Sequence, residues 1–134
     1  MYLVPDKLYH VEINIPEHLL IESLEIQKSL SEVMYSAHFL NRLRAMDEKH
    51  PFTRRDIVRS LGKIKHSPIT PFEIGTTEGK LTKMVIRIPF DNISDISIVL
   101  SISTENTIKV VTAWKNHKWD KHLTLDVTKY EQQQ

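Results

Sequence analysis

The hydrophobic and polar positions of this chain follow two different spacings, a period of two at residues 9–15 and again after residue 67, and a helical spacing between them. Apolar residues alternate with polar ones from Tyr9 to Ile15, and this period of two predicts a half-buried strand that Pro16 ends. Residues 17–48 instead carry apolar residues at helical spacing, which predicts helices with one buried face. The members of that stripe are Leu20, Ile21, Leu24, Leu30, Val33, Met34 and Ala37.

Two capping signatures divide the helical part of the chain. Ser29 precedes Glu32 by three residues, a spacing typical of a capping box, so we expect a helix to begin or break just after Ser29. Thr53 and Asp56 repeat this spacing, and the apolar residues that follow predict a third helix. Gly62 is expected to end or weaken that helix. Its apolar residues are Ile57, Leu61 and Ile64.

The later part of the chain returns to a period of two after a proline-containing connector at residues 67–71. Short polar turns at residues 91–92 and 104–106 separate the apolar stretches, and strands joined by such short loops run antiparallel. We therefore predict an α+β fold, in which an N-terminal strand and helices precede an antiparallel β-meander packed on the helices. The residues expected on its buried face are Met84, Ile86, Ile88 and Phe90, then Ile96, Ile98, Leu100 and Ile102, then Ile108, Val110, Thr112 and Trp114.

Length and composition narrow the classes of protein. A chain of 134 residues predicts a single domain, residues 1–134. The absence of cysteine excludes disulfides, Cys-ligated zinc and thiol nucleophiles. No apolar run approaches the roughly 20 residues that cross a bilayer, and the first residues do not resemble an export signal, so no membrane partner is expected. Phosphate-binding loops, nucleophile elbows and dinucleotide fingerprints are absent from the sequence.

Charge is distributed unevenly although the net charge is +1. Residues 1–32 are mostly acidic, whereas residues 42–65 are mostly basic. The basic part could follow a phosphate backbone, with Arg54 and Arg55 binding the substrate. A solvated helix face accounts for the same residues equally well.

Two segments carry a family resemblance. A His-x-x-x-Arg pattern lies within residues 37–44, and the predicted last strand ends in a threonine- and asparagine-bearing segment at residues 112–116. With the order of helices and meander, they resemble the barnase, EndoU, tRNA-cleaving colicin and RelE group of small ribonucleases, and most closely its phage- and plasmid-borne toxin-like members. The resemblance covers about residues 33–126, with 1–32 as an N-terminal extension and 127–134 as a tail. It implies metal-independent RNA cleavage or inhibition of translation, without a cofactor, in the cytoplasm of a bacterial host cell.

The chemistry of RNA cleavage can be matched to particular residues. Attack by the 2′-hydroxyl needs a base, an acid and cations that hold the phosphorane charge. His38 and Arg42 are four residues apart on a predicted helix, so Arg42 could clamp a phosphate while His38 transfers a proton. A carbonyl-bonded helix histidine and a surface arginine are the competing interpretations. The catalytic candidates are His38, Arg42, Arg87, Thr112 and His122.

The roles predicted for Arg87 and Thr112 depend on which face of the sheet each side chain occupies. Arg87 alternates with apolar neighbours, so its cation should lie on the open side of the sheet, either on a substrate or in solvent. Periodicity places Thr112 on the apolar face, whereas the resemblance implies a contact with phosphate. A β-bulge could reconcile the two positions, but the sequence does not specify one.

The polar segment after the last strand allows several interpretations. His117, Asp120 and His122 could ligate a metal, but His-Asn-His nucleases need a helix after such a hairpin, and little chain follows His122. We favour a loop that binds phosphate or transfers protons without a metal, and a loop with no special role is an equal alternative. Trp119 is expected to stack on bases and Trp114 to pack. The substrate-binding candidates are Asn116, Trp119, Lys121, Arg54 and Arg55.

The sequence thus predicts a metal-independent endoribonuclease, a toxin or phage effector whose partner is RNA. The alternative is a non-enzymatic inhibitor from a phage or mobile element that binds a host protein or nucleic acid. A structural module with an incidental polar loop is a third interpretation. An inhibitory protein partner and a homodimer both stay open.

Overall fold

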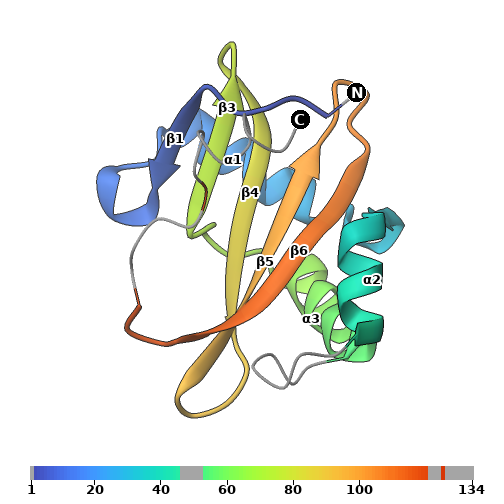
Figure 1. Ribbon diagram of the computed structural model, residues 1–134. Coiled ribbons are helices and arrows are strands. Elements are labelled where there is room, and N and C mark those ends of the chain that lie inside the picture. The colour runs from blue at the N-terminus through green and yellow to red at the C-terminus, as the bar shows by residue number, and fades with distance from the viewer. Residues whose placement is uncertain (1, 46–52, 121–124, 126–134) are drawn as a thin grey trace.

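Six strands form one sheet with helices on one of its faces, as the computed structural model shows for residues 2–45, 53–120 and 125 (Figure 1). The strand order is β1-β3-β4-β5-β6-β2. The α+β fold class is therefore confirmed. In chain order the elements are β1 (Lys7–His10), α1 (Glu17–Gln27), β2 (Val33–Tyr35), α2 (Ala37–Ala45), α3 (Arg54–His66), β3 (Glu73–Thr77), β4 (Lys80–Pro89), β5 (Ser94–Ile102) and β6 (Ile108–His117), with 3₁₀ turns at Val11–Ile13 and Leu30–Glu32.

The three apolar stretches predicted for the antiparallel meander are present as β4, β5 and β6, and β3, which none of these stretches covers, pairs antiparallel with β4. The apolar face of the meander and the three helices enclose the main core, because alternate strand residues point to the same side. Phe90 does not belong to it: β4 ends at Pro89, and the Phe90 side chain is 38% exposed. The fully buried side chains of this core include Phe39, Ile57, Ile64, Met84, Ile86, Ile98 and Leu100.

Helix α3 begins where the sequence predicted. Thr53 is its N-cap, the Thr53 hydroxyl accepts from the Asp56 amide, and the Asp56 carboxylate accepts from the Thr53 amide at 2.8 Å. This reciprocal pair is a capping box, which satisfies amides that the helix leaves unbonded. Gly62 neither ends nor interrupts the helix, which continues to His66.

The N-terminal strand is shorter than predicted and ends at His10. The His10 side chain accepts a hydrogen bond from the Glu12 amide, and Asn14 adopts a left-handed conformation with φ of 52°. This local bonding turns the chain into a 3₁₀ turn instead of extending the strand. The expectation of a strand that continues to Ile15 was therefore wrong.

Within residues 17–48, where the spacing predicted only helices, the structure contains a short strand. A break follows Ser29, as expected, but Ser29 makes no side-chain cap, and residues 33–35 form β2, which pairs in parallel with β6. Helix α1 also buries a different stripe, formed by Leu19, Ser23 and Gln27.

The buried side-chain amide of Gln27 explains this rotation of α1. It donates to the Ile69 carbonyl at 2.7 Å and accepts from the Ile69 amide at 2.8 Å. These bonds satisfy both ends of a buried amide, so a polar residue can occupy the core side. Among the described residues, no helix is long and apolar enough to span a bilayer.

Candidate functional site on the open face of the sheet

A β-bulge in β6 decides which residues reach the face of the sheet that the helices leave open. Val99 of β5 pairs with Thr112, but the next residue, Leu100, pairs with Val110, so the register passes over Val111. The extra residue reverses the alternation, because side chains on either side of a bulge change face relative to the simple period. Thr112 and Trp114 therefore lie opposite to the buried Val110, which corrects the prediction from periodicity.

The open face gathers polar residues from three strands in register. Arg87 of β4 is opposite Ser97 of β5, and Ser97 is opposite Trp114 of β6. One row further, Asp95 is opposite Asn116. Residues paired in this way share a face, so the sheet brings together the candidates Arg87, Thr112 and Asn116.

Trp114 and Trp119 have different environments. Trp114 is half-buried and packs against a small cluster on the open face that contains Val85, Val99 and Leu125, so the packing expectation for Trp114 is confirmed. Trp119 is 68% exposed, and its ring stacks on His117 with centroids 5.0 Å apart and planes 16° apart. An exposed indole stacked on an imidazole presents an aromatic surface on which a base could stack.

Arg87 lies on the open side, as predicted, but it is not solvated. Its side chain is 8% exposed, and Nη2 lies 3.2 Å from Asp95 Oδ2. Nη2 also donates to the His117 carbonyl at 2.8 Å, Nη1 donates to the Asp120 carbonyl, and the guanidinium lies 4.5 Å from the centre of the Phe72 ring. These contacts hold the turn at residues 117–120 against the sheet.

Asn116 is oriented by a neighbouring strand. The Ser97 hydroxyl, which is fully buried, donates to Asn116 Oδ1. The side-chain amide of Asn116 is half-buried at the rim of the open face. A polar group fixed in this way can orient a ligand without first losing its own conformational freedom.

Helix α2 begins beside the bulge. The Ser36 hydroxyl donates to the Val111 carbonyl at 2.9 Å and accepts from the Phe39 amide at 3.1 Å, so one side chain joins the helix N-terminus to β6. His38 is exposed on this helix, but α2 packs through Phe39 on the same face of the sheet as α3, so the structure does not bring His38 onto the open face. Arg42 also belongs to α2, but its side chain lies outside the described residues, as do Lys121 and His122.

Arg54 and Arg55 do not join this site. Both lie at the start of α3, which packs on the other face of the sheet (Figure 1). The Arg54 guanidinium lies 4.9 Å from the centre of the Tyr35 ring. Within residues 2–45, 53–120 and 125, no group of three or more His, Asp or Glu side chains could hold a metal, and His122 of the metal hypothesis lies outside these ranges.

A second polar row on the open face was missed by the sequence analysis. Lys83, Ser101 and Lys109 are opposite one another on β4, β5 and β6. Lys109 Nζ lies 4.1 Å from the centre of the Tyr2 ring, and the Ser101 hydroxyl has no hydrogen-bond partner among the described residues. Lys83 alternates with the same apolar residues as Arg87, so the spacing could have placed both cations on one face.

Burial of Lys83 has a consequence for pH dependence. Burial, and then the charge of Lys109, lower the pKa of Lys83 from 10.5 to about 8. Between about pH 8 and pH 10.5 the unfolded chain binds more protons than the folded chain, so the free energy of unfolding should rise as the pH rises. Below about pH 8 the penalty on the folded state is fully present.

We therefore expect Lys83→Met to be more stable than wild type at pH 7 and to lose this advantage by pH 10.5. The gain at pH 7 should be about 2 kcal/mol, less than the full equivalent of the pKa change, because a lysine can move its ammonium toward water. Urea unfolding of both proteins at several pH values measures the difference. A difference that stays constant from pH 7 to 10.5 contradicts the prediction.

Comparison of the chain with protein-family models, with curated proteins and with solved structures found no match. The functional assignment therefore depends on the chain's own residues and their arrangement.

Proposed function

We propose that this protein is a small metal-independent endoribonuclease that binds RNA on the open face of its sheet. The observation that carries the proposal is the bulge at Val111. It brings Thr112, Trp114 and Asn116 to the face that also presents Arg87. Such a face, with polar and aromatic groups fixed on strands, suits a single-stranded RNA whose bases are accessible.

The proposed reaction needs only side chains of this chain. A base removes the proton of the ribose 2′-hydroxyl, the 2′-oxygen bonds to phosphorus, and the bond from phosphorus to the 5′-oxygen breaks as an acid protonates that oxygen. The products are a 2′,3′-cyclic phosphate and a 5′-hydroxyl. His122 transfers the protons, or His38 does so from the start of helix α2 beside the bulge in β6, and Thr112 with Asn116 orients the phosphate.

Cations and an aromatic stack supply affinity in this proposal. Arg87 and Lys121 hold the phosphate, and Trp119 stacks on a neighbouring base. The high exposure of Trp119 and its stacking on His117 support this role.

Incubation of the purified protein with total RNA in EDTA tests the proposal, with products resolved by size and end chemistry. We expect discrete fragments with cyclic phosphate ends that are lost in His38→Ala or His122→Ala. His18→Ala is the matched control, because His18 is an exposed histidine near the start of α1, a helix that carries none of the proposed site residues, and should retain cleavage. Cleavage that survives in both test variants, or that EDTA abolishes, contradicts the proposed mechanism.

One observation favours a non-enzymatic binding protein as the second candidate function. The Arg87 guanidinium is already bonded to Asp95 and to two carbonyls, so contact with a phosphate requires some of these bonds to be exchanged. If RNA stays intact but its addition quenches the fluorescence of Trp119, the result would support a non-enzymatic binding protein.

A further inference from the structure

The outer edge of β2 and the groove beside it form a surface that the proposed RNA site does not use. Among the described strands β2 is the last of the sheet, paired on one side with β6. The Ser36 amide continues that pairing by donating to the Val110 carbonyl at 3.0 Å. Because backbone groups alternate in direction along a strand, the amides and carbonyls of Val33 and Tyr35 point away from the sheet.

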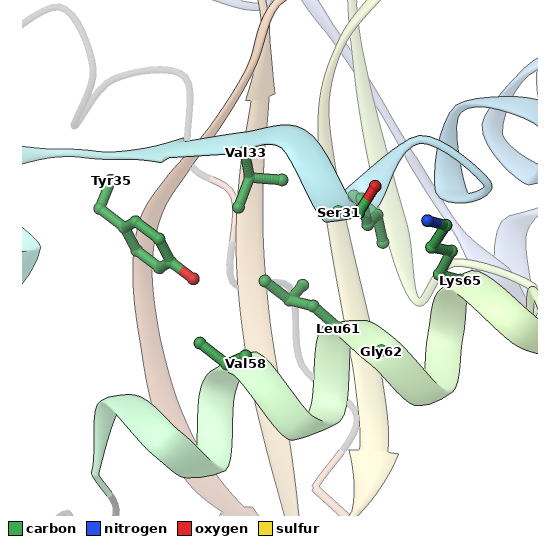
Figure 2. Close-up of a pocket in the computed structure, with 8 residues that line it drawn as sticks. Ser31, Val33, Tyr35, Val58, Leu61, Gly62 and Lys65 are labelled. Carbon is green, nitrogen blue, oxygen red and sulfur yellow. The ribbon is translucent and has the colours of Figure 1, made fainter.

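An apolar groove lies between this edge and helix α3. Figure 2 shows Val33 and Tyr35 pointing from β2 toward α3, where Val58 and Leu61 point back at them. The groove has a volume of about 330 Å³, within the usual range for sites that bind small ligands or a few side chains. Leu30, Ser31, Gly62 and Lys65 complete its lining.

Two features show that the groove has room for an incoming side chain. Val58 on its wall is 51% exposed, although it is a large apolar residue. A Cβ atom added at Gly62 would meet no atom within 4 Å, so the backbone of α3 is open there. Unpaired strand edges beside apolar grooves are the geometry in which proteins add an extended peptide as a further strand.

The charge of α3 indicates which kind of molecule the groove and the β2 edge would bind. Five Lys or Arg residues lie between residues 53 and 66, and the single acidic residue there, Asp56, is held in the capping box. An acidic peptide would neutralise these cations, whereas a second copy paired symmetrically through β2 would place another basic α3 beside the first. RNA could pair its phosphates with these cations, but it would not add to the edge of β2 as a strand or fill an apolar groove.

We propose that β2 and the groove bind an extended acidic segment of a partner protein, which adds as a strand and inserts alternate apolar side chains against Val58 and Leu61. This site lies on the helix side of the sheet and does not depend on the proposed ribonuclease activity. Backbone bonds to Val33 and Tyr35 would give affinity, and the groove would give specificity.

Selection from a displayed library of random twelve-residue peptides tests this proposal. We expect enriched peptides in which acidic and apolar residues alternate. Their affinity, measured by fluorescence anisotropy, should fall at least tenfold for Gly62→Leu, whose side chain fills the groove. This variant should stay folded, because replacing a helix-interior glycine favours the helix.

The matched control is His66→Leu, which adds the same side chain at an exposed position of α3 outside the groove lining, keeps all five Lys and Arg residues of the helix, and should bind the peptides normally. Methylation of alternate peptide amides should also abolish binding, because it removes the strand donors. Failure to enrich such peptides, equal binding to Gly62→Leu, or displacement of the peptide by an RNA oligomer overturns the proposal. A wild-type dimer that Gly62→Leu dissociates would identify a second copy as the occupant and would equally overturn it.

Discussion

Arg87→Ala should lower the free energy of unfolding by about 3 kcal/mol, because it leaves a largely buried carboxylate without its cation. The Asp95 side chain is 16% exposed, and its Oδ2 lies 3.2 Å from Arg87 Nη2. The same substitution removes the donors that fasten the carbonyls of His117 and Asp120. Urea unfolding followed by circular dichroism measures the loss.

A double-mutant cycle separates the ion pair from the other contacts of Arg87. Asp95→Ala introduced into Arg87→Ala should recover part of the lost stability, since no unpaired carboxylate then remains. Arg54→Ala is the control: its arginine is exposed and lies over an aromatic ring, so it should cost less than about 1 kcal/mol. Strict additivity of Arg87→Ala and Asp95→Ala contradicts the assigned pair.

A further substitution at the same position bears on the function of Arg87. Arg87→Lys retains a charge for a phosphate but cannot hold a carboxylate and two carbonyls in one planar geometry. It should therefore be destabilised, and in the proposed ribonuclease it should keep more activity than Arg87→Ala at a temperature where both are folded.

The elements that the sequence predicted correctly are those specified by local signals. Helix α3 has its capping box and its apolar residues within one continuous segment, so no distant partner is needed to define it. The meander was predictable for a similar reason: short polar turns separate its regular alternations. Alternation alone also placed Arg87 on the open face.

The strand β2 was not predictable because its identity comes from a distant partner. Val33, Met34 and Tyr35 continue a helical spacing in the sequence, but they pair with residues 108–110 of β6. Three residues carry too little local signal to outweigh this context. The buried Gln27 was missed for the same reason, since its partner is the backbone of Ile69, 42 residues away.

The candidate site was only partly predictable because it depends on register. The bulge at Val111 exists only in relation to β5, and one extra residue changes the face of every residue after it. Periodicity therefore placed Thr112 and Trp114 on the wrong face. The partners of Arg87 were also beyond the sequence, because two of them are backbone carbonyls.

Phe39→Ala should have the largest effect on stability, about 4 kcal/mol, because it opens a cavity where α2 meets the core. Phe39 is fully buried, and its ring stacks on Tyr35 with centroids 6.2 Å apart and planes 14° apart. The other described residues of α2 are half-buried or exposed, so this side chain is the main apolar anchor among them. Urea unfolding measures the loss as a lower midpoint.

His38→Ala is the control on the adjacent position of the same helix. His38 is exposed, so its removal should change the free energy of unfolding by less than about 0.5 kcal/mol. A loss below 1 kcal/mol for Phe39→Ala would show that α2 is held by other contacts. Because α2 carries both His38 and Arg42, a large loss would instead mean that the placement of this helix, and with it of the two candidates, depends on one buried ring. In the proposed ribonuclease, Phe39→Leu, which refills most of the cavity, should then restore stability and RNA cleavage together.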